Sequence, residues 1–306
     1  MLDILFNSLC IELNRNYVKV VEGRKGKKVN LSKLQYIKLN SLNDTVLDVL
    51  DENLIIDVLN KFFFENKVSK KNVNVVLSGL TNLLVREVTI PYVQSDKIYT
   101  MLKYESAQYF PVNIDKYILD YKVLEVLKDG KNKKLRLLVF AVPKNIIDQV
   151  ISIVNRLNLK VNKIDIEPNV LAKLSKRLEI GEKKSEMLLN IENNFLTAVI
   201  VKDGIVQLTK TYPHDLNFGE DGELIISEYS LNEIYENIIK LIEFYRLRER
   251  QELNSVYTLG EMSKMIKLNE VLPSKAGVEV KYIENIDFVE TEFDKYKFIV
   301  PIATFI

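Results

Sequence analysis

Few side chains in this sequence have the types and spacing that catalysis or metal binding requires. His214 is the only histidine, so sites with several histidine ligands, such as HExxH, are excluded, and its turn-like setting does not indicate catalysis. The single cysteine, Cys10, lies in an apolar run without a neighbouring cation, which predicts a core residue rather than a nucleophile. The acidic cluster at residues 220–223 lacks the alternating ligands of a calcium loop and is expected to be a solvated loop. We therefore predict no metal site and no catalytic residue.

The glycines are too sparse for a typical phosphate-binding loop. The chain has 10 glycines among 306 residues, and it contains no GxGxxG motif, no Walker loop and no Gly-Gly pair. A loop that wraps a phosphate needs glycines because its backbone must approach the anion closely or adopt a positive φ. This distribution does not favour phosphate binding.

Charge and hydropathy exclude two further classes of function. Lys and Arg total 43 against 42 acidic residues, whereas nucleic-acid binding normally needs a strongly basic domain or stripe. The longest uninterrupted apolar run is Leu137–Val142, far shorter than the roughly 20 residues of a membrane span. The N-terminal residues also lack the pattern of a signal peptide. We therefore expect a soluble cytoplasmic protein that neither binds nucleic acid nor inserts into a membrane.

The order of the predicted elements indicates two related halves. Residues 9–39 have the pattern strand, turn, strand, turn, strand, and residues 187–211 repeat it. Between them, residues 84–157 are predicted to form a strand, a helix, two strands and a helix, and an earlier helix is expected to begin at Asp44. The polar stretch 181–185 is the candidate hinge. Such a duplication favours two half-domains with any ligand between them.

One stretch carries a specific family resemblance. Residues 85–124, VREVTIPYVQSDKIYTMLKYESAQYFPVNIDKYILDYKVL, combine a strand that ends in proline, a helix with Glu before an aromatic-Pro stop, and an Asp-Tyr strand. Over nearly its whole length the chain resembles PilM, the actin-like cytoplasmic protein of type IV pilus assembly and a relative of FtsA. The matching positions are Pro91, Glu105, Tyr109, Pro111, Asp120 and Tyr121.

The resemblance implies an α/β fold of the actin-like type, a duplicated RNase H-like unit with two lobes and an inserted α+β module. The first lobe is expected to comprise residues 1–85 and 160–184, the inserted module 86–159, and the second lobe 185–306.

The first phosphate motif that the resemblance implies is altered in this chain. An intact motif resembles Asp-Ile-Gly-Ser-Ser-Ser followed by a strand with lysine. Here Lys19 is retained, and Glu12 keeps the acidic charge on a longer side chain. Asn14 replaces the glycine, and the bulky Arg15 and Tyr17 replace small hydroxyl residues. Arg15 could still attract a phosphate, but the glycine that would let the backbone approach it is gone.

The other two nucleotide motifs are altered as well. In place of Asp-Ile-Gly the chain has Asn190 and Glu192 around a retained isoleucine, which places a new carboxylate where the backbone should approach phosphate. Anions at close range repel each other when they are poorly solvated. The adenosine-side Gly-Gly is Gly260-Glu261 here. We therefore expect a pseudo-ATPase without a cofactor; the alternative is a working actin-like ATPase that binds ATP with Mg, supported by Lys19 and Gly260.

The resemblance also implies a partner. PilM-like proteins bind the N-terminal cytoplasmic tail of the inner-membrane protein PilN, so a peptide groove is expected that involves the inserted module and the first lobe. Its candidate residues are Pro91, Tyr104, Glu105 and Pro111, with Glu105 alternatively a structural salt-bridge or capping partner. The expected role is a scaffold at the inner face of the cell membrane. It would relay tail occupancy or lobe angle to the pilus platform or its motor ATPases.

A third class of function is an FtsA-like membrane tether of filaments. Such a protein carries a basic amphipathic helix after the fold, whereas the segment FIVPIATFI, residues 298–306, is expected to be a strand or a core segment. The resemblance does not separate a pilus protein from a component of a related secretion system.

Overall fold

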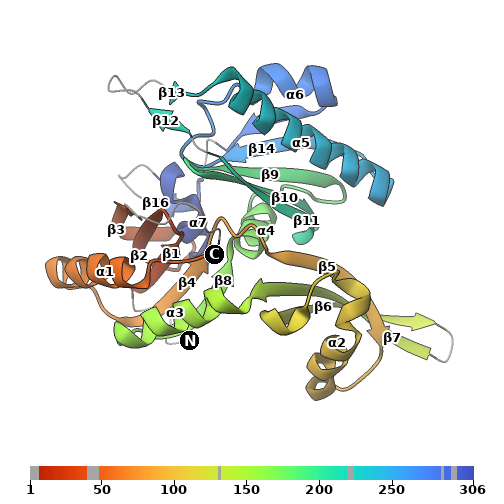
Figure 1. Ribbon diagram of the computed structural model, residues 1–306, viewed down its shortest axis with the longest axis horizontal. Helices are drawn as coiled ribbons and strands as arrows, with labels where there is room; N and C mark the ends of the chain where they lie inside the picture. Colours follow the sequence, from red (N-terminus) through yellow and green to blue (C-terminus); the bar gives the residue numbers. More distant parts are fainter. Residues whose placement is uncertain are drawn as a thin grey trace.

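The computed structural model describes residues 7–39, 48–129, 132–214, 216–218, 224–283, 286–290 and 295–306. Two sheets with their helices form two lobes, one above the other in Figure 1, and a smaller three-stranded unit projects from the lower lobe. Asp44, Gly130 and the acidic cluster at 220–223 lie outside the described residues.

The first lobe is built on a sheet whose strands lie in the order β16-β3-β2-β1-β4-β8. β1 and β2 are buried along nearly their whole length, including the charged residues Glu12 and Lys19. β1 pairs antiparallel with β2 and parallel with β4. The strands are β1 (Ser8–Leu13), β2 (Tyr17–Arg24), β3 (Val29–Lys38), β4 (Lys71–Leu77), β8 (Lys160–Ile166) and β16 (Val289–Glu290).

The second lobe repeats this arrangement with the strand order β11-β10-β9-β14-β15. In both lobes three strands are joined antiparallel and two further strands continue the sheet in parallel from the first of these; in the first lobe β16 is added in parallel at the other edge. The repeat confirms the two similar halves that the sequence predicts. The elements are β9 (Ser185–Ile191), β10 (Phe195–Lys202), β11 (Ile205–Pro213), β14 (Leu253–Leu259) and β15 (Glu279–Tyr282), with α5 (Glu228–Glu249), α6 (Leu268–Ala276) and the short pair β12 (Asn217–Phe218) and β13 (Leu224–Ile225).

The inserted module has its own sheet, in the order β5-β7-β6, and its own apolar core. α2 packs on this sheet, whereas α3 turns its apolar side chains, such as Val150, into the core of the first lobe and lies against α1. This double attachment ties the module to the first lobe. The elements of the module are β5 (Leu84–Pro91), α2 (Ser95–Tyr109), a 3-10 turn (Ile114–Lys116), β6 (Tyr117–Asp129), β7 (Asn132–Pro143) and α3 (Lys144–Arg156); α1 (Glu52–Asn66) precedes the module in the chain and α4 (Glu167–Arg177) follows it.

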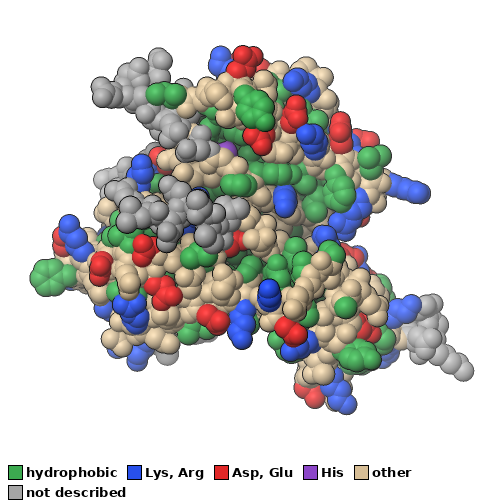
Figure 2. Space-filling view, viewed as in Figure 1, with side chains coloured by type: hydrophobic (Ala, Val, Ile, Leu, Met, Phe, Trp, Pro, Cys, Tyr) green, Lys and Arg blue, Asp and Glu red, His purple; other side chains and the backbone are tan. Residues whose placement is uncertain are grey.

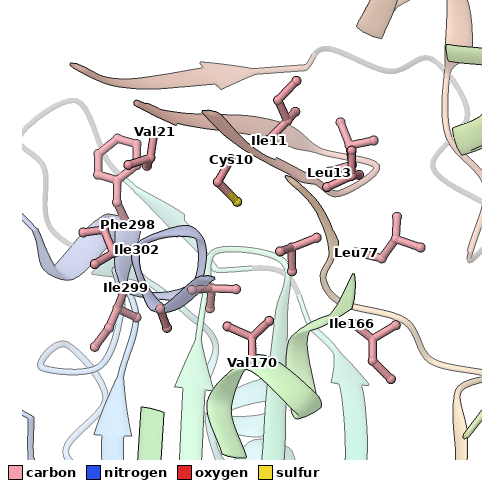
Figure 3. Packing of buried hydrophobic residues seen from close by; sticks show 14 of the residues in the cluster. Cys10, Ile11, Leu13, Val21, Leu77, Ile166, Val170, Phe298, Ile299 and Ile302 are labelled. Carbon is pink, nitrogen blue, oxygen red and sulfur yellow. The ribbon is translucent and has the colours of Figure 1, made fainter. Parts of the chain in front are cut away.

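The C-terminal residues do not belong to the second lobe, which corrects the predicted boundary at 185–306. β16 pairs with β3, and α7 (Ile299–Ile302), between the 3-10 turns at 296–298 and 303–305, packs on β1 and β2. The apolar segment predicted as a strand or core segment is helical, and it is core. It covers apolar residues of β1 that would otherwise face water. Figure 3 shows Cys10 among these side chains, as predicted, and burial raises the pKa of its thiol.

The first helix begins later than predicted, at Glu52 rather than at Asp44. Asp51 is its N-cap, because its carboxylate accepts a hydrogen bond from the backbone N–H of Leu54 at 3.1 Å. Asp48 has left-handed backbone geometry (φ 56°), and its carboxylate accepts bonds from Thr81 and Asn82. Residues 48–51 thus anchor the loop to the start of β5. Among the described residues, no helix is long and apolar enough to cross a membrane.

Candidate functional site

The strand register brings the altered nucleotide motifs together between the lobes. Glu12 of β1 lies directly opposite Lys19 of β2, and in the second lobe Asn190 of β9 lies opposite Thr197 of β10. Directly opposite residues share one face of a sheet. All four side chains are buried.

A buried ion pair joins the two lobes at this point. Lys19 Nζ lies 2.8 Å from Glu192 Oε1, and both side chains are at most 2% exposed. The two residues are 173 positions apart in the sequence. Beside them, the hydroxyl of Tyr17 donates to Glu12 at 2.8 Å, and its ring stacks on Phe195 of the second lobe with centroids 6.3 Å apart. A salt bridge and an aromatic contact therefore hold the lobes together.

Burial and neighbouring charges shift the pKa values of three groups in this centre. Burial, together with the charge of Glu12, raises the pKa of Glu192 to about 7 despite the attraction of Lys19. Burial opposes the charged form of Lys19, but the carboxylates of Glu192 and Glu12 outweigh it and raise the pKa of the lysine. Burial also raises the pKa of Tyr17, so its hydroxyl remains a donor. Among these groups the acidic side chains outnumber the single cation.

Glu167 is a second buried carboxylate between the lobes, and the sequence analysis missed it. It accepts from the backbone N–H of Gly79 at 3.0 Å, from the amide of Asn190 at 2.7 Å and from the hydroxyl of Thr197 at 3.1 Å. Gly79 follows the first-lobe strand β4, whereas the other two donors belong to the second lobe. Glu167 begins α4, where the helix dipole favours a negative charge. Burial nevertheless raises the pKa of Glu167 to about 7. The sequence did contain a signal for this role, because Glu167 lies directly after a predicted strand and before Pro168.

The first altered loop is closed by its own side chain. Asn14 donates to the Ser78 carbonyl at 2.9 Å and accepts from the N–H of Asn16 at 2.9 Å. A Cβ atom on Gly79 would lie 2.4 Å from the Asn14 amide, so the two loops are in direct contact. With Arg15 they line a cavity of about 20 Å³, room for about one water molecule.

The Gly260-Glu261 loop is pressed onto the end of β9. Gly260 has φ +93°, and a Cβ atom there would lie 2.4 Å from Asn190 Oδ1 and 2.5 Å from the Ile191 carbonyl. Glu261 forms an ion pair with Lys297, whose ammonium lies 4.1 Å from the ring centre of Tyr36. The glycine is required here for contact between protein segments.

This arrangement does not fit a magnesium nucleotide. The cavity of about 20 Å³ beside Asn14 is far below the roughly 300 Å³ of a ligand pocket. The carboxylates of Glu12 and Glu192 would face a polyphosphate without the glycine backbone that normally cradles it. Within the described part of the chain no group of three or more His, Cys, Asp or Glu side chains is placed to hold a metal ion.

A separate cleft of about 410 Å³ lies between the first lobe and the inserted module. Residues 49–53 form one wall, and Gln149 and Arg156 of α3 form the other. The side-chain amide of Gln149 both donates to the Leu50 carbonyl at 2.9 Å and accepts from its N–H at 3.1 Å, as a neighbouring strand would. Arg156 donates to Asn53 at 3.0 Å. In this cleft the backbone N–H and carbonyl of Leu50 therefore bond to a side chain, and not to a neighbouring strand.

The residues predicted for the peptide groove lie elsewhere on the module. Tyr104 is 87% exposed on α2, and Glu105 accepts a hydrogen bond from Tyr109 at 2.9 Å, which is a structural role. Pro91 ends β5, and Pro111 follows α2, both exposed. None of these residues lines the cleft beside Gln149.

Comparisons with known proteins agree with this architecture. A family model described as type IV pilus assembly protein PilM matches residues 10–234. A chain of a solved PilM-PilN type IV pilus biogenesis complex has a TM-score of 0.76 at 17% identity, covering 97% of this chain and 96% of that chain. No curated protein sequence matches.

Two more distant structures share the fold. A Bacteroides thetaiotaomicron protein described as having an actin-like ATPase fold has a TM-score of 0.53 at 12% identity, covering 94% of this chain and 96% of that one. The cytoplasmic domain of EpsL, an inner-membrane component of the Vibrio cholerae type II secretion system, has a TM-score of 0.52 at 10% identity. The match covers 98% of this chain and 93% of that one. The actin-like α/β fold expected from the sequence is confirmed.

Proposed function

Since the chain belongs to the PilM family of type IV pilus assembly proteins, we propose that it is a cytoplasmic scaffold of the pilus platform that works without nucleotide. It binds the cytoplasmic tail of a PilN-like membrane protein, and that partner holds it at the inner face of the membrane. The PilN partner of the similar solved complex supports this assignment.

The observation that carries the proposal is the buried pair of Lys19 and Glu192. In a nucleotide-dependent switch, the phosphates bridge the lobes and their loss lets the lobes separate. Here a lysine of one lobe and a carboxylate of the other provide the bridge themselves. Breaking a buried ion pair costs about 3–5 kcal/mol, so the relative position of the lobes is set by the polypeptide.

The tail is proposed to lie in the cleft beside residues 49–53. An extended peptide gains affinity from backbone hydrogen bonds and specificity from side-chain pockets. Leu50 presents both its N–H and its carbonyl toward α3, where the Gln149 amide occupies them. A tail backbone can take the place of that amide. Since α3 belongs to the inserted module, occupancy of the cleft alters how the module is held, and this is the signal relayed to the platform or its motor ATPases.

Isothermal titration calorimetry of the purified protein tests both parts. With MgATP we expect no saturable heat. With a synthetic N-terminal tail peptide of a PilN-like protein we expect one-to-one binding in the micromolar range, about 8 kcal/mol. One-to-one binding of MgATP would instead make the switching ATPase the better account.

Two substitutions locate the tail. Asn53→Trp places a bulky side chain in the cleft from an exposed position, and we expect it to weaken tail binding about tenfold or more, which is about 1.4 kcal/mol. Tyr104→Ala is the matched control on α2 and should leave affinity unchanged. The reverse pattern would move the tail to the surface formed by Pro91, Tyr104, Glu105 and Pro111.

A further inference from the structure

A second groove, of about 390 Å³, opens where the inserted module meets the second lobe. We call it the β5–α5 groove. Residues 81–86 at the start of β5 form one side, and residues of β11 and α5 form the other, next to the point where β5 packs against β11. The recess is on the right of Figure 2, where basic and hydrophobic side chains lie side by side. It shares no lining residue with the cleft proposed for the tail.

The groove carries positive charge. The charged side chains that line it are Arg86, Lys210 and Lys240, and no Asp or Glu is among the described residues of its lining. Lys240 pairs with Glu236 of the same helix at 2.9 Å, so the proposal rests on the charges of Arg86 and Lys210. Arg86 donates to the backbone carbonyl of Val85 at 3.1 Å. Burial and the nearby charge of Arg248 together lower the pKa of Arg86. A half-buried guanidinium with a second positive charge nearby favours an incoming carboxylate, which Arg binds through paired hydrogen bonds.

The same groove offers an apolar anchor point. Phe244 of α5 lines it and is 50% exposed, and Val112 on the module side is 36% exposed. One turn after Phe244, Leu247 is 81% exposed. Removing exposed apolar surface from water is favourable, so a partner gains free energy by covering these side chains. Apolar area beside a basic rim is the composition of a protein-binding surface.

We propose that the β5–α5 groove is a docking site for an acidic segment of a partner protein, one that carries carboxylates next to aliphatic or aromatic side chains. The carboxylates pair with Arg86 and Lys210, and the apolar side chain packs on Phe244. Because the groove joins the inserted module to the second lobe, the occupant bridges two parts of the scaffold that the tail cleft does not connect.

The shape and charge of the groove favour this occupant over other polyanions. A nucleic acid needs an extended basic stripe that tracks many phosphates. An anionic membrane surface is bound by clusters of about 4–8 Lys and Arg beside the bilayer. Arg86 and Lys210 beside a concave, partly apolar groove instead match the polar contacts and the anchor of one short segment.

Fluorescence anisotropy with two labelled probes tests the proposal. The first is the peptide Glu-Asp-Leu-Phe-Glu-Asp-Leu, and the second is the same peptide with lysine at every acidic position. We expect the acidic probe to bind the full chain and the basic probe not to bind. Arg86→Glu combined with Lys210→Glu should weaken the acidic probe at least about tenfold, because it replaces attraction by repulsion. The matched control, Lys122→Glu combined with Lys128→Glu, reverses two exposed charges on β6 and should bind like the parent protein.

A second pair of variants tests the anchor without altering charge. Phe244→Ala should weaken the acidic probe about tenfold, whereas Phe64→Ala, at an 86% exposed position on α1, should not. Both replaced rings are exposed enough that the protein is expected to fold, and thermal unfolding checks this. Binding of the tail peptide should be unchanged in all of these variants, which separates a failure here from a failure of the proposed function.

Three outcomes would overturn the proposal. The acidic probe does not bind the parent protein, or it binds equally to the Arg86→Glu, Lys210→Glu protein. In the third, vesicles of phosphatidylcholine and phosphatidylglycerol bind the parent protein and displace the acidic probe. The same vesicles do not bind the Arg86→Glu, Lys210→Glu protein. That last result would assign the groove to a lipid surface.

Discussion

The centre between the lobes and the β5–α5 groove both contain clustered charges, but the two clusters differ in burial and in pairing. At the centre, Lys19 and Glu192 are buried and bonded to each other at 2.8 Å. In the groove, Arg86 and Lys210 line an open recess without a carboxylate among its described lining. In the first cluster the single cation is paired within the protein, whereas Arg86 and Lys210 have no counter-charge among the described lining of the groove.

The difference shows how a site for a ligand is distinguished from a site that has become structural. A buried charge must be paired inside the protein because water cannot solvate it. A half-exposed charge can remain unpaired until a partner arrives, at little cost to folding. Under the proposed function, the centre between the lobes serves stability and recognition takes place at the surface.

The largest expected effect comes from breaking the central pair. Lys19→Met leaves Glu192 and Glu12 buried without a cation, and we expect the free energy of unfolding to fall by about 3–5 kcal/mol. Urea unfolding measures the loss. Adding Glu192→Leu should recover part of it, because the second uncompensated charge is then removed as well. A loss below about 1 kcal/mol in the single variant would contradict the assigned structural role.

A smaller effect is expected from pH through Glu167. Its pKa is raised to about 7 in the folded protein, against about 4.3 in an unfolded chain. The folded state therefore binds the proton more tightly, and the stability from this group is complete below about pH 4 and lost as pH rises through about 7. The total is about 4 kcal/mol. Urea unfolding between pH 5 and 8 should show stability falling with pH.

The matched variant for this pH effect is Glu167→Gln, whose stability should fall less steeply over the same range. An amide rotation at Asn190 presents Oδ1 to the new amide, so the substitution keeps a hydrogen bond there. Glu192 titrates in the same direction, so some slope should remain. Parallel profiles for the two proteins would show that Glu167 is not the titrating group.

The smallest effect is expected in the groove. Arg86→Met removes a guanidinium that lies near the charge of Arg248, and we expect the free energy of unfolding to stay constant or to rise by about 0.5 kcal/mol. Thermal unfolding at low and high salt measures it, and the difference between the proteins should shrink as salt screens the repulsion. A loss above about 1 kcal/mol would mean that Arg86 is held by the fold and is not reserved for a partner.

The family resemblance and the repeat in the sequence predicted the fold correctly, because both depend on local patterns. Three altered motifs were identified from the sequence, and the structure brings Glu12, Lys19, Asn190 and Glu192 together. Their consequence was not predictable, since the ion pair joins residues 173 positions apart. The peptide-groove residues Pro91 and Tyr104 came from the family pattern, and they stay a prediction.

Two errors have a common physical cause. Residues 298–306 were assigned to the second lobe because they follow it in the sequence, yet their apolar side chains complete the core of the first lobe. Glu167 was passed over because a lone glutamate at a helix start is usually solvated. Its burial depends on Gly79 from one lobe and Asn190 from the other.

The sequence by itself determined the elements, their duplication, the family, and the loss of the glycines that a phosphate requires, because each of these is written in neighbouring residues. Only the tertiary structure decided which charges meet. The packing of distant strands and helices determines whether Lys19 and Glu192 form a buried ion pair. It also determines whether Arg86 lies near the charge of Arg248. Desolvation and Coulomb energy act through space and not along the chain.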